Sequence, residues 1–498
     1  MRFRSIFLFL LSGNLLVTGA TLWRDVTLAA VFGATRESDI LFLAISIPVF
    51  LITVTTASFR SAVVPALGSA LATSPALWTT IARRFLLVAS LVALVIAVLL
   101  GAVATLVYWS DLPAAAGPNR RLFALFLVAI LPMYVASALV ELIQGPLQVA
   151  GKFLAPSALR IGLPVGVVLG ALLFPEQSVF SVALGGGAGA LLALALGLGL
   201  LWQARFIPPI SASALPPDVK RSVVTSYGAL VTATCITYAN PLVDQWVAGL
   251  AGEGSVSMLG YANRLTVGIS ALVAGALSQA LLVHFGRLVS VGDTEGIQKS
   301  FRQLIRVAPW LGGFVTLGVW LTSDMGISLL YARGNFSAET SDRVSTLLDI
   351  YALQFPIYWT GITAVALVWA VSLNRVFIRI GIILFAVNAI CDVVLLRLFG
   401  LDGLPVTTSI VFALSTILLT VALRKAGKIE ISGGDLGGIL VPFVLLGLFA
   451  LGIRQYGIRL SPDATPSTLL LAAMMLVSFG TVSAVVGYRT IFKGGSVV

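Results

Sequence analysis

Long apolar runs separated by short polar connections follow one another along the whole chain. Each run holds about 20 or more residues with few charges, which is the length that an α-helix needs to cross a bilayer. This pattern predicts an all-α, polytopic membrane protein with about 14 transmembrane helices. The expected spans are residues 6–33, 38–72, 79–109, 122–149, 156–174, 178–203, 222–251, 255–289, 303–323, 344–372, 376–399, 402–424, 437–455 and 467–488.

The composition excludes a soluble domain. The mean hydropathy is +1.04 and only 10% of the residues are charged, against about 25% in soluble proteins. No polar connection is long enough to fold alone, so any chemistry is expected inside the helical bundle or at its rims. The first span exceeds the length of a signal peptide and is expected to be retained.

The positive charge of the chain predicts its orientation in the membrane. With the N-terminus in the cytoplasm, the inner connections carry most of the Lys and Arg residues, including Arg83 with Arg84 and Lys220 with Arg221. Because inner loops are rich in Lys and Arg, both termini are expected in the cytoplasm. The net charge of +11 is therefore a topology signal and does not indicate a nucleic-acid partner.

A proline-rich segment, residues 205–221 (RFIPPISASALPPDVKR), divides the predicted helices. Prolines cannot continue a helix, so we expect a cytoplasmic linker between a six-helix lobe at 1–204 and a second at 222–425. A weak internal repeat, an aspartate followed eight residues later by a glycine, occurs in both lobes, as Asp25 with Gly33 and as Asp244 with Gly252. It favours two pseudo-symmetric halves, which is a common plan among transporters. Residues 426–498 then supply a last helix pair and a short cytoplasmic tail.

Three arginines, Arg24, Arg60 and Arg264, lie within predicted spans. An arginine among lipid tails is unfavourable, so such a residue normally faces a protein-lined cavity with a partner. Arg24 and Arg264 each lie about nine residues from the outer end of their helix, a depth of about 14 Å. Fixed cations at that depth indicate a binding site for a phosphate or diphosphate, which arginine grips bidentately.

The alternative is that each arginine neutralises a nearby acid. The candidate acids in the spans are Asp25, Asp39 and Glu141. Adjacent positions on a helix point apart, so Asp25 is expected to be a poor direct partner for Arg24. Both interpretations stay open for Arg60.

A second group of polar residues lies in the spans of the second predicted lobe. Asn388 and Asp392 share one helical face at i, i+4, Asp244 lies in the first span of that lobe, and Thr407 and Thr408 lie in its last. Carboxylate, amide and hydroxyl oxygens are hard ligands that suit a small cation. Sodium is the expected ion, and a proton shared by the two carboxylates is the competing interpretation. No organic cofactor is expected.

Several segments are similar to those of the MurJ (MviN) family of lipid II flippases, within the superfamily that also holds the multidrug and toxin extrusion transporters. The segments that carry the resemblance are WRDVTLAAVFGATRESDILFLAISIP, GSVSMLGYANRL and LLYARGNFS. The similarity extends over nearly the whole chain. It implies two lobes that alternate between inward-open and outward-open states, a cationic cavity for a diphosphate and sugar head group, and a groove at 426–498 for the lipid tail.

The resemblance also implies roles for single residues. Arg24 and Arg264 match cavity arginines of the family, while Asp25 and Asp39 match acidic positions associated with the substrate site. The family's sodium site corresponds to Asp244, Asn388, Asp392, Thr408 and the backbone carbonyl of Leu404.

The chain departs from the family pattern at three places. Thr18 and the pair Ile52-Thr53 stand where arginines are expected, and Asn263 replaces an acid. Arg60 lies seven residues after Thr53, two turns along much the same face of an α-helix. We therefore expect Arg60 to compensate in part and to join the substrate site.

The resemblance and the arginines together predict a transporter and not an enzyme. The expected substrate is a polyprenyl-diphosphate-linked saccharide, such as a lipid II-like peptidoglycan precursor, moved from the inner to the outer leaflet of the bacterial plasma membrane. An exopolysaccharide or O-antigen repeat unit is the alternative substrate. A cation-coupled drug exporter, a membrane-embedded glycosyltransferase and a scaffold for cell-wall or polysaccharide synthesis proteins are competing classes. Short loops and a single histidine disfavour the glycosyltransferase.

Overall fold

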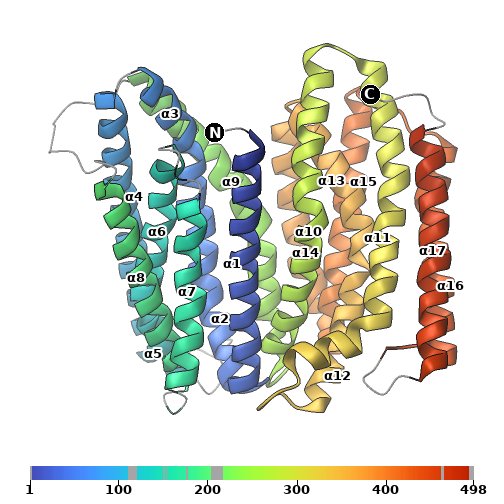
Figure 1. Ribbon diagram of the computed structural model, residues 1–498, viewed down its shortest axis with the longest axis horizontal. Helices are drawn as coiled ribbons and strands as arrows, with labels where there is room; N and C mark the ends of the chain where they lie inside the picture. Colours follow the sequence, from blue (N-terminus) through green and yellow to red (C-terminus); the bar gives the residue numbers. More distant parts are fainter. Residues whose placement is uncertain are drawn as a thin grey trace. The chain divides into compact units, whose positions relative to one another are not determined.

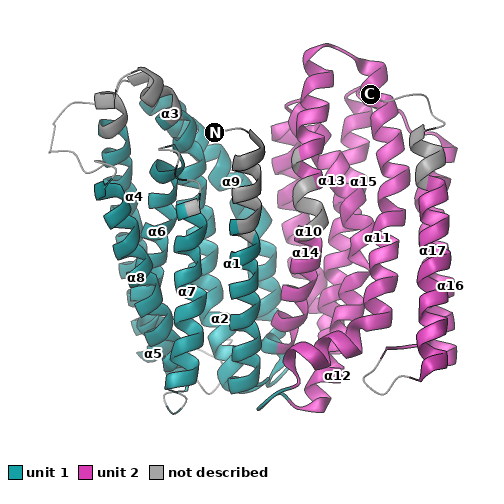
Figure 2. Cartoon of the chain, viewed as in Figure 1, with its two compact units in different colours: residues 1–257, 333–336 teal, residues 258–332, 337–498 magenta. Residues whose placement is uncertain are grey.

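The computed structural model describes residues 3–73, 75–109, 120–149, 152, 154–174, 176, 178–203, 217–460 and 465–492. Every regular element in these ranges is a helix (Figure 1). The chain forms two compact units, coloured separately in Figure 2: unit 1 comprises Met1–Ser257 with Arg333–Phe336, and unit 2 comprises Met258–Ala332 with Ser337–Val498.

Unit 1 contains a helix for each of the first seven predicted spans. Its elements are α1 Phe3–Phe32, α2 Arg36–Leu51, η1 Ile52–Ala57, α3 Ser58–Thr73, α4 Pro75–Trp109, α5 Arg120–Ala129, α6 Leu131–Val149, α7 Leu154–Leu173, α8 Phe180–Gln203 and α9 Pro217–Ala248. The predicted span 38–72 is built from α2, the π-helix η1 and α3. The predicted span 122–149 is a bent pair, α5 and α6, with an angle of 42°.

Unit 2 contains the remaining helices. These are α10 Ser255–Ser290, whose first turn belongs to unit 1, then α11 Thr294–Tyr331, α12 Ala338–Ala352, α13 Gln354–Ala370, α14 Asn374–Phe399, η4 Gly400–Asp402, α15 Gly403–Lys425, α16 Gly433–Tyr456 and α17 Pro466–Phe492.

Large apolar side chains lie exposed on the helices of both units, such as Leu106 in unit 1 at 69% and Val283 in unit 2 at 74%. Such surfaces are stable in lipid, because bilayer tails are as apolar as the side chains.

The all-α, multi-pass membrane fold is confirmed. Within the described ranges, ten helical segments are long and apolar enough to cross a membrane, and the bent α5–α6 pair makes eleven. The expected number of 14 stays a prediction.

The two compact units do not divide the chain at the predicted linker. Residues 205–216 of that linker lie outside the described part of the chain. The following helix, α9, packs against α2, η1 and α3 within unit 1: Tyr227 makes an edge contact with Phe59 at 5.3 Å between ring centroids. The Ser58 hydroxyl donates to Thr234 Oγ1 at 3.1 Å. The boundary between the units therefore follows Ser257, and the six-helix lobes at 1–204 and 222–425 stay a prediction.

Helices α7 and α8 pack at backbone contact distance through facing glycines. A Cβ atom on Gly166 would lie 2.3 Å from the carbonyl oxygen of Gly185, and one on Gly170 would lie 2.2 Å from that of Ser181. In the reverse direction, a Cβ on Gly185 would lie 2.2 Å from the carbonyl oxygen of Gly166, and one on Gly189 would lie 2.2 Å from that of Gly162. Small residues spaced four apart allow this approach, which maximises van der Waals contact between helices in a membrane.

The last helix pair, α16 and α17, packs against α11 within unit 2. Trp310 on α11 and Phe449 on α16 both contact the Phe479 ring of α17, each with centroids 5.8 Å apart. Leu446 and Leu321 extend this apolar contact. Figure 1 shows the pair lying alongside α11 for most of its length.

Polar contacts hold this helix pair to α11 at both ends. At one end, the fully buried Asp435 accepts from Arg306 Nη2 at 2.6 Å and Nε at 2.9 Å, and Arg302 lies at 3.4 Å. The same carboxylate accepts from the Ser432 amide and hydroxyl, which caps α16.

At the other end, Arg459 binds Asp324 at 3.2 Å and Asp349 at 2.8 Å, and the Leu460 amide donates to the Leu321 carbonyl at 2.8 Å. Burial disfavours the Arg459 guanidinium, but the two carboxylates outweigh burial and raise its pKa.

Asp435→Ala is expected to loosen this attachment. The substitution removes the cap of α16 and leaves two arginines without their shared carboxylate, so we expect a loss of about 2–4 kcal/mol in the free energy of unfolding. Thermal unfolding of the purified protein measures the loss, and hydrogen exchange should rise first around residues 428–440. The control is Glu430→Ala, because Glu430 contributes only backbone groups to the contacts with Gln298 and Arg302. Equal stability of the two variants would contradict the prediction.

Candidate functional site

Arg24, in the second half of α1, forms an ion pair with its neighbour Asp25. Its Nε and Nη2 atoms both donate to Asp25 Oδ1, at 2.9 and 2.8 Å. The expectation that Asp25 is a poor partner was wrong: the arginine side chain is long enough to fold back along the helix. The Arg24 side chain is 19% exposed and the Asp25 side chain 4%. The pair fixes one edge of the guanidinium and leaves Nη1 outside these contacts.

Arg60 also has an acidic partner. Its Nε donates to Glu141 Oε1 on α6 at 2.9 Å, and the buried Gln144 side chain donates to the other carboxylate oxygen at 2.8 Å. Of the two interpretations that the sequence left open for Arg60, the local ion pair is present. It engages only Nε of the guanidinium.

Arg60 does not share the face of Thr53, contrary to expectation. The π-helix η1, Ile52–Ala57, lies between them. A π turn takes one residue more than an α turn, so the residues that follow are rotated by roughly a quarter of a turn. The seven-residue spacing therefore does not return to the same side, and Arg60 meets α6.

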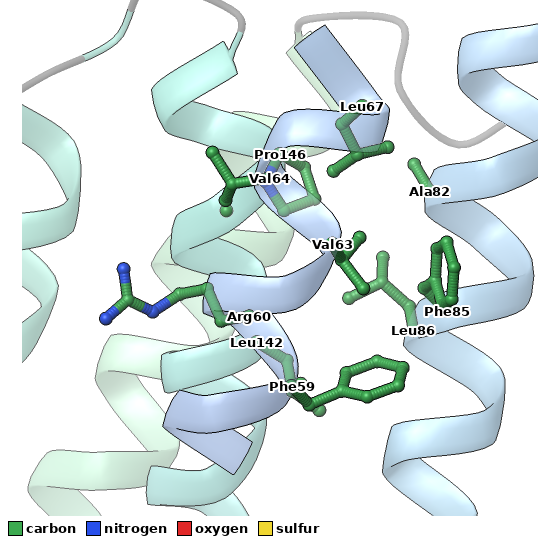
Figure 3. A pocket seen from close by; sticks show the side chains of 11 residues that line it. Phe59, Arg60, Val63, Val64, Leu67, Ala82, Phe85, Leu86, Leu142 and Pro146 are labelled. Atoms are coloured by element: carbon green, nitrogen blue, oxygen red, sulfur yellow. The ribbon is translucent and has the colours of Figure 1, made fainter. Parts of the chain in front are cut away.

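Figure 3 shows the surroundings of Arg60. Its aliphatic stem borders a small pocket between α3, α4 and α6 that is otherwise lined by apolar side chains, such as Phe59, Phe85 and Leu142. The guanidinium points away from the rest of that lining. The pocket itself is therefore ordinary apolar packing, and the chemistry of Arg60 lies on its other side.

Arg264 lies half-buried in α10, next to Asn263. It belongs to unit 2, whereas Arg24 and Arg60 belong to unit 1. A cavity shared by the three arginines stays a prediction.

Asp39, near the start of α2, binds the first turn of α10. Its Oδ2 accepts from the Gly254 amide at 2.7 Å, and its Oδ1 accepts from the amide and the hydroxyl of Ser257, both at 2.8 Å. Helix N-termini favour negative charge, because their first amides lack partners within the helix. Both oxygens of Asp39 are thus engaged at a helix end, a structural role that the sequence did not indicate. Its predicted substrate role stays a prediction.

Asp39→Asn is expected to release the start of α10. An asparagine offers one acceptor oxygen and places an NH₂ group against backbone donors, which should lower the free energy of unfolding by about 1.5–3 kcal/mol. Hydrogen exchange at residues 253–259 measures the local effect. The matched control is Glu253→Gln, whose exposed side chain accepts a 3.3 Å hydrogen bond from the Arg36 backbone amide. Unchanged exchange in the Asp39 variant would refute the assignment.

Residues 333–336 cap the C-terminal end of α1. Sequence reasoning missed this contact. The Asn335 amide donates to the Ala30 carbonyl at 2.9 Å, and its side chain donates to Val31 at 2.6 Å. Gly334 has φ +58°, and a Cβ there would lie 2.2 Å from the Ala30 carbonyl oxygen. Gly-Asn after an apolar run was the available signal, since both residues favour turns.

The hairpin of α14, η4 and α15 carries four of the five predicted sodium ligands. Asn388 and Asp392 are buried on α14, with 2% and 0% exposure, and the Asn388 side chain donates to Asp392 Oδ2 at 2.9 Å. On α15 the Thr408 hydroxyl donates to the Leu404 carbonyl at 3.2 Å.

The fifth predicted ligand, Asp244, is 8% exposed on α9 and belongs to unit 1. The Asp392 carboxylate and the Asn388 amide on α14, with the Thr408 hydroxyl and the Leu404 carbonyl on the neighbouring helix α15, supply oxygen atoms of the kind that a hard cation prefers. The complete site stays a prediction.

Membrane-spanning helices in two compact units, with paired charges inside the apolar segments, define a multi-pass membrane protein of the transporter type. The family model described as "Lipid II flippase MurJ" matches residues 28–460. The chain belongs to this family, which consists of transporters and not of catalysts.

Individual relatives are distant. The chain is 26% identical over 426 residues to the probable lipid II flippase MurJ of Vibrio cholerae, covering 81% of this chain and 79% of the relative. It is 25% identical over 289 residues to the probable lipid II flippase MurJ of Bdellovibrio bacteriovorus, covering 57% and 54%. With that of Rickettsia prowazekii it shares 22% over 306 residues, covering 61% and 60%. The alignments with these last two relatives thus span less than two thirds of their length.

Two solved structures show the same fold. One, described as lipid II flippase MurJ in an inward closed conformation, has a TM-score of 0.74 at 19% identity and covers 97% of this chain and 99% of that one. The other is an inward-facing multidrug resistance MATE family transporter of the MOP superfamily, with a TM-score of 0.65 at 13% identity and coverage of 82% and 94%. Both likenesses are of fold, and the expected superfamily stays a prediction.

Proposed function

We propose that the protein is an alternating-access flippase in the bacterial inner membrane. It moves a polyprenyl-diphosphate-linked saccharide, a lipid II-like peptidoglycan precursor, from the inner to the outer leaflet. The observation that supports this proposal best is the family match over residues 28–460. The arginines within the apolar helices agree with it, because they offer donors for a diphosphate.

In this proposal, Arg24, Arg60 and Arg264 bind the diphosphate. Arginine is suited to this role because its planar fork of N–H donors matches phosphate oxygens. The ion pairs of Arg24 and Arg60 keep each guanidinium in one orientation while part of its donor set remains for substrate. An ordered donor loses less side-chain entropy on binding than a mobile one. The helix pair α16–α17 would hold the polyprenyl tail, and both termini would lie in the cytoplasm.

Sodium is proposed as the coupling ion, at Asp244, Asn388, Asp392, Thr408 and the Leu404 carbonyl. An ion shifts a conformational equilibrium only when it binds one state more tightly than the other. Because the proposed ligands are divided between unit 1 and unit 2, a change in the relation of the units would change the number of ligands available. A proton shared by Asp244 and Asp392 is the competing proposal.

An exopolysaccharide or O-antigen repeat unit is the second candidate substrate. It is favoured by the departures from the family pattern at Thr18, Ile52, Thr53 and Asn263, together with the additional Arg60. A drug exporter is disfavoured, since cationic drugs would meet arginines, and the similarity to multidrug transporters extends only to the fold.

A lipid-accessibility assay in cells depleted of the protein tests the proposal. Depletion should leave the lipid-linked precursor in the inner leaflet, protected from an externally added enzyme that cleaves it. Re-expression of the protein should restore cleavage. If every candidate lipid-linked glycan still reaches the outer leaflet after depletion, the proposed function is wrong.

A further inference from the structure

Arg60 is held from one side only. Its Nε donates to Glu141 Oε1 at 2.9 Å, and among the described residues no other hydrogen bond or ion pair engages the guanidinium. The terminal nitrogens Nη1 and Nη2 therefore keep their four N–H donors available. This terminal edge is the part of an arginine that binds two oxygens of one phosphate.

Three residues of α6, Glu141, Gln144 and Gly145, determine how the Arg60 side chain lies against this helix. Glu141 and Gln144 lie three residues apart, on one face of the helix, and the Gln144 side chain donates to the free oxygen of Glu141 at 2.8 Å. Gly145 follows, where a Cβ would lie 3.3 Å from Arg60 Cγ. Because Gly145 has no side chain, the aliphatic stem of Arg60 fits against α6 at this position. The Glu141 carboxylate, one turn earlier on α6, binds Nε.

The exposed fraction of the side chain rises from Gln144 through Glu141 to Arg60. Gln144 is 2% exposed, whereas the Glu141 and Arg60 side chains are 17% and 23% exposed. The buried amide thus fixes the carboxylate, and the carboxylate binds Nε of the guanidinium, while the Arg60 side chain as a whole stays partly exposed. Figure 3 shows the guanidinium directed away from the apolar pocket.

We propose that Glu141 and Gln144 are positioning residues that present the terminal edge of Arg60 to a phosphate group of the lipid-linked substrate. The inference deepens the proposed function and rests on it. The chemistry that Arg60 recognises is the phosphate group, carried either by the polyprenyl lipid or by free pyrophosphate.

The test measures binding of undecaprenyl diphosphate to the purified full-length protein in nanodiscs, with inorganic pyrophosphate as competitor. Arg60→Gln and Glu141→Gln should each weaken binding about 10- to 100-fold, as expected for charged hydrogen bonds. Because the two residues act on one contact, Glu141→Gln should have little further effect in the Arg60→Gln background. Pyrophosphate should displace the lipid from the unmodified protein and do so less well from Glu141→Gln.

An exchange variant separates positioning from stability. Arg60→Glu combined with Glu141→Arg restores the ion pair, so the midpoint of thermal unfolding should return towards that of the unmodified protein. The guanidinium then belongs to α6, so binding should stay weak. Recovery of binding in this variant, or independent effects of Arg60→Gln and Glu141→Gln, would show a structural ion pair only.

The outcomes also distinguish the inference from the proposed function. If the unmodified protein binds the lipid and Arg24→Lys weakens binding while Arg60→Gln leaves it unchanged, the inference alone is overturned. If the unmodified protein does not bind undecaprenyl diphosphate at all, both are overturned. Lipid that pyrophosphate never displaces would exclude phosphate as the group that Arg60 recognises.

Discussion

Arg24→Ala is expected to abolish transport, with complete loss of growth when it is the only copy in cells that depend on the protein. The substitution removes a side chain that is 19% exposed on α1 and whose guanidinium is ordered by Asp25. It also leaves the nearly buried Asp25 carboxylate without that cation. Breaking such a pair lowers the free energy of unfolding by about 3–5 kcal/mol. Loss of growth alone would therefore not separate a transport defect from a folding defect.

Two further variants separate these effects. Arg24→Ala with Asp25→Asn removes both charges, so much of the stability should return while transport stays absent. Arg24→Lys keeps a cation but loses the planar fork, so it should fold normally and transport poorly. Growth, protein level in the membrane and the midpoint of thermal unfolding are measured together. Normal growth of the double variant would show that Arg24 is not needed for transport.

The helices were predictable because lipid imposes a simple rule on the sequence. Every backbone group in the bilayer core must bond within the chain, so an apolar run of sufficient length becomes a helix. The predicted spans 255–289 and 402–424 accordingly match Ser255–Ser290 and Gly403–Lys425. The predicted span 303–323 was too short, because hydropathy does not detect the polar first turns of α11, Thr294–Tyr331.

Breaks within helices were not predictable from hydropathy. The π-helix at Ile52–Ala57 and the 42° bend between α5 and α6 leave the apolar pattern uninterrupted. Pro48 and Pro65 lie inside α2 and α3, but prolines are also tolerated in regular membrane helices and do not locate a break. The missed π-helix had a direct consequence, because the expected face of Arg60 depended on continuous α-helical geometry.

The polar residues in the spans were predicted more reliably than their partners. An arginine within an apolar run is visible in the sequence, but its contacts depend on side-chain reach and on distant segments. Arg24 binds its neighbour, which helix geometry alone disfavoured. Asp39 binds backbone amides more than 200 positions away in the chain. Charged residues in membranes indicate that a partner exists, and only the structure identifies it.

The chain passes from one unit to the other after Ser257, Ala332 and Phe336. Each of these crossings lies beside a segment that is bonded within unit 1. Asp39 holds the segment before the first crossing, and Asn335 holds the short segment between the other two. If the units move during transport, as proposed, these contacts determine which residues stay with unit 1 during the movement.

Gly166→Ala is expected to separate α7 from α8 and to destabilise the whole protein. The added Cβ would lie 2.3 Å from the Gly185 carbonyl oxygen and 2.8 Å from Gly189 Cα. Both obstacles are backbone, so no side-chain rotation relieves the contact and the helices must move apart. Overpacking of this kind lowers the free energy of unfolding by about 1–3 kcal/mol or more, and we expect the upper part of that range.

The control for this prediction is Gly187→Ala on α8. A Cβ at Gly187 meets nothing within 4 Å, and alanine is the better helix former by about 1 kcal/mol. The two substitutions add the same methyl group, yet they should shift the midpoint of thermal unfolding in opposite directions. Size-exclusion profiles of the detergent-solubilised proteins provide a second measurement, in which Gly166→Ala should aggregate first. Equal midpoints would show that α7 and α8 are not packed at backbone distance.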